Sequence, residues 1–261
     1  MSAPAPDWDA KLYHRVSTFQ ESWALKMMDE RLPLAGDETV LDAGCGSGRV
    51  TRYLVERLPR GRVIGVDAAP SMIEHAREEL GSAATLINAD LTALTPDLIW
   101  ERAGVGAVDV VFSNATFHHI SDHDALFRSL SEVLRPGGRV VAQCGGEGNV
   151  EEFGAVVEAV LADDPFAEHF AGWDPPWYFS SLKDAERRLV SAGFDPVDCW
   201  MTEFQAAPED PRAFMRASGF ASILERLPAG LRDAFVDAVF ERIDEPVVFD
   251  YVRLNIDAVR A

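Results

Sequence analysis

Cysteines, basic residues and long apolar runs are all scarce in this chain of 261 residues. Its three cysteines, Cys45, Cys144 and Cys199, are odd in number and show no metal-binding spacing. The scarcity argues against a disulfide framework and favours a reducing compartment, so we expect a cytoplasmic protein without a bound metal. No apolar stretch reaches the length that crosses a membrane.

Positive charge is also in short supply. The chain has 24 Lys and Arg against 43 Asp and Glu, which gives a formal net charge of -19. A surface of that sign repels phosphate backbones and anionic lipids, so we expect neither nucleic acid nor a membrane as partner. The sequence leaves the oligomeric state open.

What the chain does have is enough apolar material for a sizeable core, because 48% of its residues are hydrophobic. The length is large for one simple domain and small for two. We therefore expect one α/β core with an appended cap.

The most informative segment is residues 40–49, where an apolar strand runs into glycines at every second position, Gly44, Gly46 and Gly48. Glycines let the backbone turn sharply and lie directly against a ligand. Apolar residues then recur at helical spacing, so free N–H groups at a helix start face the same crevice. A dinucleotide fingerprint needs glycine at the place of Arg49, which disfavours NAD.

Two further strands end in acids. Residues 62–66 lead to Asp67, and residues 84–89 lead to Asp90. A carboxylate at the end of the second strand suits the hydroxyls of a ribose. The alternative for Asp67 is a cap on the following helix, which the Pro70 start would also favour.

The order of the next segments adds specificity. A strand over residues 108–112 is followed by His118 and His119, and after a helix comes a turn at residues 134–138 and a strand over residues 139–143. Taken in this order, residues 40–143 resemble the class I S-adenosylmethionine-dependent methyltransferases.

The resemblance implies a cofactor, S-adenosylmethionine, and the residues that bind it. The glycine turn would line the methionine and ribose portion, Asp67 would take the ribose hydroxyls, and Asp90 would accept from the adenine amino group. Met72 would lie on the adenine face, or it is a core methionine. The expected cofactor residues are Tyr13, Gly44, Cys45, Gly46, Gly48, Asp67, Ala68, Met72, Asp90, Leu91 and Asn114.

The resemblance also implies the fold: a Rossmann-like seven-stranded sheet, mostly parallel with an antiparallel last strand, flanked by helices and carrying a mostly helical cap. The expected parts are N-terminal lid helices (1–37), a cofactor-binding core (38–147), a cap insertion (148–179), the core continued (180–205), a helical cap of three helices (206–245) and the last core strand (246–261).

Within the family, the trans-aconitate and juvenile hormone acid methyltransferase-like group is the nearest in pattern. Its N-terminal segment closes over the cofactor, and Tyr13 and Gln20 match that pattern loosely. Gln20 is a weaker catalytic candidate. The alternative is a helix over residues 12–32 that merely docks on the sheet.

Residues outside the core determine which acceptor is methylated. Trp173, Trp177 and Tyr178 lie in an aromatic, proline-rich loop that can wall off water, or that forms a buried satellite cluster. Arg216 pairs with an anionic substrate, or it is a solvated helix charge.

His118 is the candidate base or substrate positioner, with His119 as a further substrate contact and His123 expected at the surface. The first choice is O-methylation of a small molecule, at a hydroxyl or a carboxylate. N- or C-methylation is the second choice. A non-catalytic cofactor-binding or scaffold protein of the same fold and a nicotinamide oxidoreductase remain as alternatives.

Overall fold

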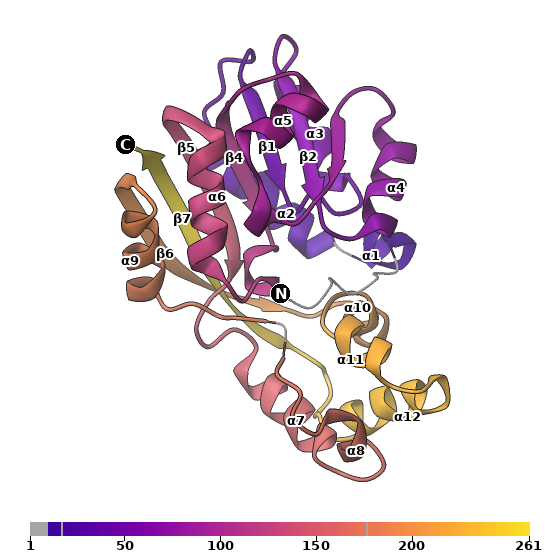
Figure 1. The fold of residues 1–261 in the computed structure, drawn as a ribbon. Coiled ribbons are helices and arrows are strands. Elements are labelled where there is room, and N and C mark those ends of the chain that lie inside the picture. The colour runs from indigo at the N-terminus through magenta and orange to yellow at the C-terminus, as the bar shows by residue number, and fades with distance from the viewer. Residues whose placement is uncertain (1–9, 17, 176) are drawn as a thin grey trace.

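A seven-stranded sheet in the order β3-β2-β1-β4-β5-β7-β6 forms the centre of the molecule (Figure 1). The computed structural model describes residues 10–16, 18–175 and 177–261. Strands β1 to β5 pair in parallel, and β7 lies antiparallel between β5 and β6. This confirms the predicted fold class. The strands are β1 (Thr39–Ala43), β2 (Arg62–Asp67), β3 (Thr85–Asn88), β4 (Val108–Asn114), β5 (Leu134–Gly145), β6 (Phe194–Ala206) and β7 (Phe249–Arg260).

Helices cover both faces of the sheet. Helices α2 (Thr18–Arg31) and α3 (Arg49–Arg57) bury their apolar residues against one face, with α4 (Pro70–Leu80) beside α3. The other face is covered by α5 (Pro96–Ala103), α6 (His123–Val133) and α9 (Leu182–Ser191). A parallel sheet buried on both faces explains why its strands read as short continuous apolar runs.

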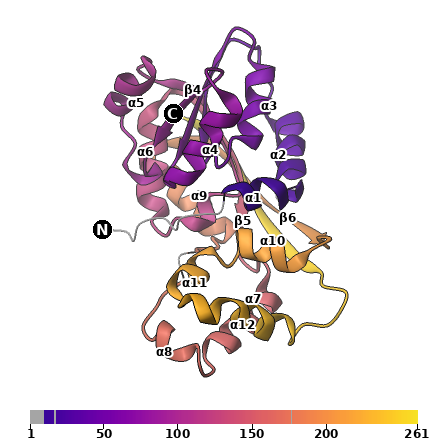
Figure 2. The same ribbon diagram turned by 90° about the vertical axis from the view of Figure 1, so that its right-hand side faces the viewer.

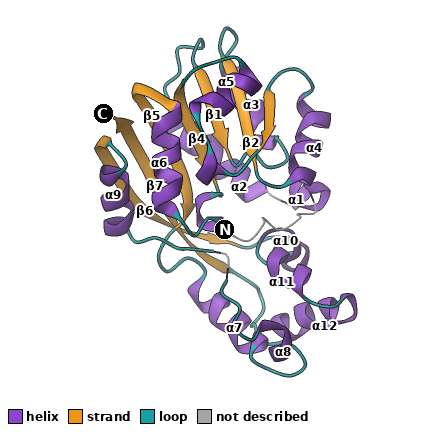
Figure 3. Ribbon diagram, in the orientation of Figure 1, coloured by secondary structure: helices purple, strands orange, loops and turns teal. Residues whose placement is uncertain are grey.

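The cap is a second, separate apolar cluster below the sheet, seen as purple helices in Figure 3. It consists of α7 (Glu151–Leu161), α8 (Ala167–Phe170), α10 (Pro211–Ser218), α11 (Ala221–Arg226) and α12 (Ala229–Phe240). These helices leave the sheet after β5 and after β6, so one sheet carries the whole cap. The three helices predicted between residues 210 and 243 are confirmed.

The N-terminal helices join the core to the cap. Helix α1 (Ala10–Val16) precedes α2 and contacts both α4 of the core and α10 of the cap, so it lies between the two (Figure 2). Helices α1 and α2 cover most of the helix predicted over residues 12–32, and residue 17 between them lies outside the described residues. Residues 1–9 of the expected lid lie outside the described residues, and the division into lid, core and cap stays a prediction.

The turn predicted at residues 134–138 falls within the bounds of β5, where the pairing skips residues 135–138 and Gly137 has φ +75°. These residues are the first part of β5, because Leu134 pairs with Val108 before an irregularity in the register, and regular pairing resumes at Arg139. In the part of the chain that is described, no helix combines the length and apolarity needed to cross a membrane.

Phe235 is completely buried in the cap cluster, between Phe166 and Phe220 at ring distances of 5.6 and 5.3 Å. We therefore predict a large loss of stability when its side chain is truncated. Phe235→Ala should lower the free energy of unfolding by about 3–5 kcal/mol, because it leaves a cavity. Urea unfolding measures this. Trp100→Ala, at a side chain that is 62% exposed, is the control and should change it by less than about 0.5 kcal/mol. A loss at Phe235 as small as that of the control would contradict the role assigned to the cap cluster.

Candidate functional site

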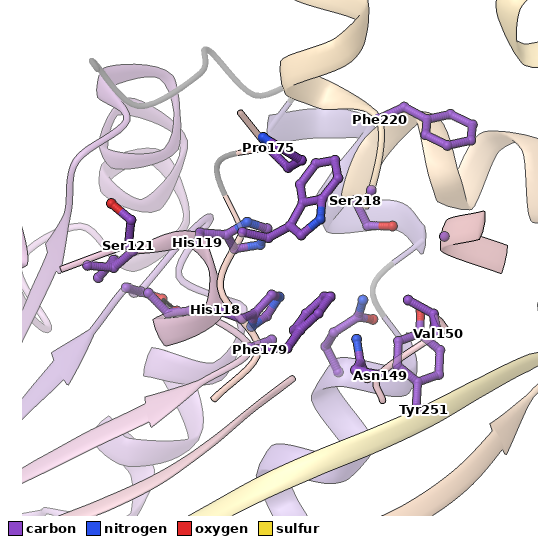
Figure 4. A pocket seen from close by; sticks show the side chains of 18 of the residues that line it. His118, His119, Ser121, Asn149, Val150, Pro175, Phe179, Ser218, Phe220 and Tyr251 are labelled. Carbon is purple, nitrogen blue, oxygen red and sulfur yellow. Dashed lines mark hydrogen bonds between the residues drawn. The ribbon is translucent and has the colours of Figure 1, made fainter. Parts of the chain in front are cut away.

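A cavity of about 1010 Å³ lies between the carboxyl ends of the parallel strands and the cap helices. Figure 4 shows side chains of both parts converging on it: His118 and His119 from the core, and Ser218 and Phe220 from the cap. The volume is at the upper end of the range for small-molecule sites, roughly 300–1,000 Å³. The space is therefore large enough for a cofactor and an acceptor together.

The glycine turn forms part of the cavity floor. Gly44 has φ +79°, its N–H donates to Val66 O at 2.8 Å, and a Cβ there would lie 2.1 Å from Thr116 Oγ1. At Gly46, with φ +53°, the nearest atom to such a Cβ is on Tyr13 at 4.0 Å. The chain at Gly44 is thus pressed between β2 and β4, while the backbone at Gly46 is open to a ligand.

Two members of the turn do not line this cavity. A Cβ on Gly48, the residue before α3, would lie 3.1 Å from the Ala76 Cβ of α4, so this glycine permits close helix packing. The buried Cys45 Sγ would lie 3.0 Å from a Cβ on Gly65, and Cys45 lines only a neighbouring cavity of about 40 Å³. We predicted that Gly48 contacts the ligand. The structure corrects this, because Gly48 instead allows α3 and α4 to pack closely.

Asp67 lines the cavity at the end of β2. Its Oδ2 accepts from Gly46 N and its Oδ1 from Ala69 N, both at 2.9 Å, so it holds both the glycine turn and the residue that precedes α4. Burial raises the pKa of this carboxyl, against the effect of these backbone bonds. Each oxygen keeps a further lone pair for a ligand hydroxyl.

The expected adenine residues gather at the end of β3. Asp90 lines the cavity, and its Oδ1 accepts from both Thr92 N and Thr92 Oγ1 at 2.8 Å, so Oδ2 is left for a ligand. Ala68, Leu91 and Met72 line the same part, and Met72 packs in a small cluster with Tyr13. This end of the cavity suits a flat ring that carries one hydrogen-bond donor.

Two oxygen atoms beside the turn are buried without a hydrogen-bond partner, Gln20 Oε1 and Asn114 Oδ1. Both residues line the cavity, and Asn114 Nδ2 donates to Gln20 O at 2.9 Å. Orphaned buried acceptors call for a donor. An ammonium group, such as that of a methionine portion, supplies one. The site therefore fits the cofactor that the resemblance implies.

Tyr13 also lines the cavity, and burial raises its pKa to about 12, with a further contribution from the charge of Asp67. It therefore stays protonated. With Gln20 it places the N-terminal helices against the cofactor part of the site.

The histidine turn lies on the acceptor side. The Gly145 N–H donates to His118 Nδ1 at 3.2 Å, so the neutral ring carries its proton on Nε2. Burial among the cavity walls lowers the pKa of His118 well below its ordinary range and that of His119 to about 4. Both rings are uncharged at neutral pH.

His123 is not at the surface. It is 1% exposed, and its Nε2 bonds Phe117 O at 2.9 Å. It fixes the turn that carries His118, which corrects the expected surface position.

The aromatic loop divides between the cavity and the core. Trp173 and Trp177 line the cavity, whereas the Tyr178 hydroxyl donates to Asp184 Oδ2 at 2.5 Å and lies outside the described lining. Arg216 pairs with the exposed Asp233 at 2.5 Å and is also outside it. The prediction that Tyr178 and Arg216 contact the substrate is therefore corrected, because both side chains lie outside the cavity lining.

The sequence reading missed several lining residues, namely Trp23, Thr116, Asn149, Phe153, Phe179, Tyr251 and Arg253. Phe179 stacks on His118 at 5.9 Å, and Figure 4 shows the two rings side by side. The one sequence signal for Arg253 was strand alternation, which puts it on the same face as Tyr251 in β7, the strand between β5 and β6. Among the described residues, no group of three His, Cys, Asp or Glu side chains is placed to hold a metal ion.

Comparison with known proteins finds relatives that are named as methyltransferases. Residues 40–138 match a family described as a methyltransferase domain. The chain is 37% identical to an uncharacterized methyltransferase of Schizosaccharomyces pombe, over 73% of this chain and 72% of that protein. It is 30% identical to a trans-aconitate 2-methyltransferase of Azoarcus sp., over 98% of this chain and 100% of that protein.

Solved structures agree on the fold. The YcgJ protein of Bacillus subtilis has a TM-score of 0.61 at 18% identity, with 92% of this chain and 98% of that chain covered. A Haemonchus contortus phosphoethanolamine N-methyltransferase, solved with S-adenosylhomocysteine, has a TM-score of 0.57 at 20% identity, with 92% and 52% covered.

The close approach at Gly44 predicts that Gly44→Ala costs about 2–5 kcal/mol of unfolding free energy, from overpacking against Thr116 and from the positive φ together. Gly104→Ala is the matched control: its φ is +69°, but no atom lies within 4 Å of the added Cβ, so only about 1 kcal/mol should be lost. Urea unfolding followed by circular dichroism compares the two. Equal losses would show that backbone conformation alone requires the glycine.

Proposed function

Since the chain belongs to the class I S-adenosylmethionine-dependent methyltransferases, we propose that its methyl acceptor is the carboxylate of a small organic acid. Full-length relatives that bear the name trans-aconitate 2-methyltransferase support this choice. Hydroxyl, nitrogen and carbon acceptors are the less favoured classes. Membership of an enzyme family with this cofactor also removes the nicotinamide oxidoreductase from consideration.

The observation that carries the proposal is the state of His118. Its Nδ1 is occupied by the Gly145 N–H, its Nε2 carries the proton, and its pKa is low. A ring in this state donates a hydrogen bond and is a poor base. A hydroxyl or protonated amine must lose a proton to react, whereas a carboxylate is already ionised at neutral pH.

The reaction then depends on positioning and on exclusion of water. When bound, the cofactor would supply the methyl group on a sulfonium, with the thioether as leaving group, and an ionised carboxylate would need no proton removed by the protein. His118 Nε2–H orients the acceptor, and Phe179 and Trp173 shield it from solvent.

On the cofactor side, we assign the ribose hydroxyls to Asp67, the adenine amino group to Asp90, and the ammonium of the methionine portion to Gln20 Oε1 and Asn114 Oδ1. The free lone pairs of Asp67 and the orphaned amide oxygens support these assignments. Gln20 thus has a binding role rather than a catalytic one.

The carboxylate proposal predicts a pH-independent rate. His119, with a pKa of about 4, and His118 below its ordinary range are neutral above about pH 6, and an acid with a pKa of about 4.3 is ionised there. We expect kcat/KM with an organic acid to be flat from about pH 6 to 9. The product should release methanol in mild base, as esters do and ethers and amines do not. A tenfold rise in rate per pH unit, or a base-stable product, would contradict the proposal.

The assignment of Asp67 predicts a loss of cofactor binding. S-adenosylhomocysteine should raise the melting temperature of the wild type by several degrees, and Asp67→Ala should abolish the shift. Asp109→Ala is the matched control, because Asp109 also accepts from a backbone N–H, that of Thr39 at 2.7 Å, but at the start of β4. It should lower the melting temperature of the free protein and keep the shift. An unchanged shift in Asp67→Ala would refute the assignment.

A further inference from the structure

Arg253 is a buried cation that forms no ion pair with an acid in the described part of the chain. It lies on β7 between β5 and β6, is 2% exposed and lines the cavity. None of the ion pairs among the described residues includes it, although the chain has 43 Asp and Glu. It is also the only Arg or Lys among the described residues of the cavity lining.

The guanidinium has few partners of any kind. Its Nε and Nη2 are buried without a hydrogen bond, and its one described contact with an aromatic ring is with Trp23, 5.0 Å from the ring centroid. Burial lowers the pKa of Arg253, and no carboxylate is among the groups that act on it. A buried charge without a partner is costly. Nε and Nη2 share one edge of the guanidinium, the kind of edge that binds a carboxylate through two parallel bonds.

Arg253 is close enough to the histidines of the acceptor side to act on them. Its charge contributes to the low pKa values of both His118 and His119, and it also acts on Tyr13 and Tyr251. An anion paired with Arg253 therefore lies near the residues proposed to orient the acceptor. The same anion would relieve the unpaired charge.

Most of the remaining acceptor wall is apolar, with Ser121, Asn149 and Ser218 as its neutral polar side chains. The apolar part consists of side chains of the cap cluster and the aromatic loop, among them Phe153, Val157, Leu161, Trp173, Phe220 and Ile223. The cap's acids in the lining, Glu151 and Glu158, are exposed and offer a second carboxylate only repulsion.

We propose that Arg253 binds the acceptor carboxylate and that the cap holds an apolar body, so that the substrate is an amphipathic monocarboxylic acid rather than a polycarboxylate. The inference rests on the proposed function, since it names the substrate class for the same site. It also separates this chain from relatives named for trans-aconitate, a tricarboxylate.

Calorimetric titration of the wild-type protein, saturated with S-adenosylhomocysteine, tests the substrate class without relying on turnover. The probes are butyrate, decanoate, decan-1-ol and trans-aconitate. Decanoate should bind more tightly than trans-aconitate by at least tenfold, and each methylene added from butyrate should increase affinity about fourfold while it is buried. Decan-1-ol should bind about 30-fold more weakly than decanoate, because it cannot pair with the arginine. Tighter binding of trans-aconitate, or equal binding of acid and alcohol, would overturn the inference.

Variants test the residue. Arg253→Gln should weaken decanoate binding by about 30-fold or more and leave decan-1-ol within about twofold. Arg253→Lys keeps the charge and should retain part of the preference for the acid, which covers the case in which the glutamine variant does not fold. Arg216→Gln, at the arginine paired with Asp233, is the matched control and should behave as wild type. An acid preference that survives in Arg253→Gln would refute the role.

Product analysis distinguishes the two proposals. Methyl ester from trans-aconitate but not from decanoate would overturn this inference and leave the proposed function standing. Absence of a methyl ester from every acid would overturn the proposed function, while the calorimetric preference for decanoate would still report on Arg253.

Discussion

The passage of the chain through Gly44 is the constraint on which the site depends. The turn after β1 is hydrogen-bonded to Val66 of β2 and pressed against Thr116 beyond β4, with no room for a side chain. The parallel pairing of β1, β2 and β3 brings their carboxyl ends to one edge, and this close approach keeps the turn after β1 at that edge. Asp67 then fastens the next part of the turn by bonding Gly46 N. The cofactor side of the cavity is thus built from backbone that is held rigidly in place.

The acceptor side is built from the other half of the sheet. β5 supplies the Gly145 N–H that sets the His118 tautomer, and β7 supplies Arg253. The same strands are joined directly to cap helices, so the residues that meet the acceptor and the helices that enclose it are linked through the chain. The junction is strained: Val150 has φ +48°, which is rare for a β-branched residue and costs about 1–3 kcal/mol. Its N–H bond to Asp250 O at 2.9 Å helps hold it there.

The cofactor half of the site could be predicted because its chemistry is local. Asp67 ends β2 and Asp90 comes two residues after β3, so knowing the strand ends places the carboxylates. Gly48 was misassigned because its contact, with Ala76, comes from another helix. Tyr178 failed for a similar reason: its neighbours in the sequence line the cavity, but a change of direction in the loop turns it toward Asp184. Arg253 could not be identified as a site residue from its neighbours in the sequence. What marks it is that no carboxylate among the described residues pairs with it, and only the folded structure shows this.

Charge explains how an acidic protein can still select an acid. The net charge of -19 opposes the approach of any anion, but at physiological salt the field of surface groups is screened over about 8 Å. The charge of Arg253 acts inside a cavity where screening is much weaker, so its short-range attraction outweighs the surface repulsion for one carboxylate. A second carboxylate meets no further cation among the described lining residues, whose other polar side chains are acids and neutral groups such as Ser121, Asn149 and Ser218. An apolar body meets the cap and gains from burial, so the same walls that reject additional charge favour a hydrophobic acid.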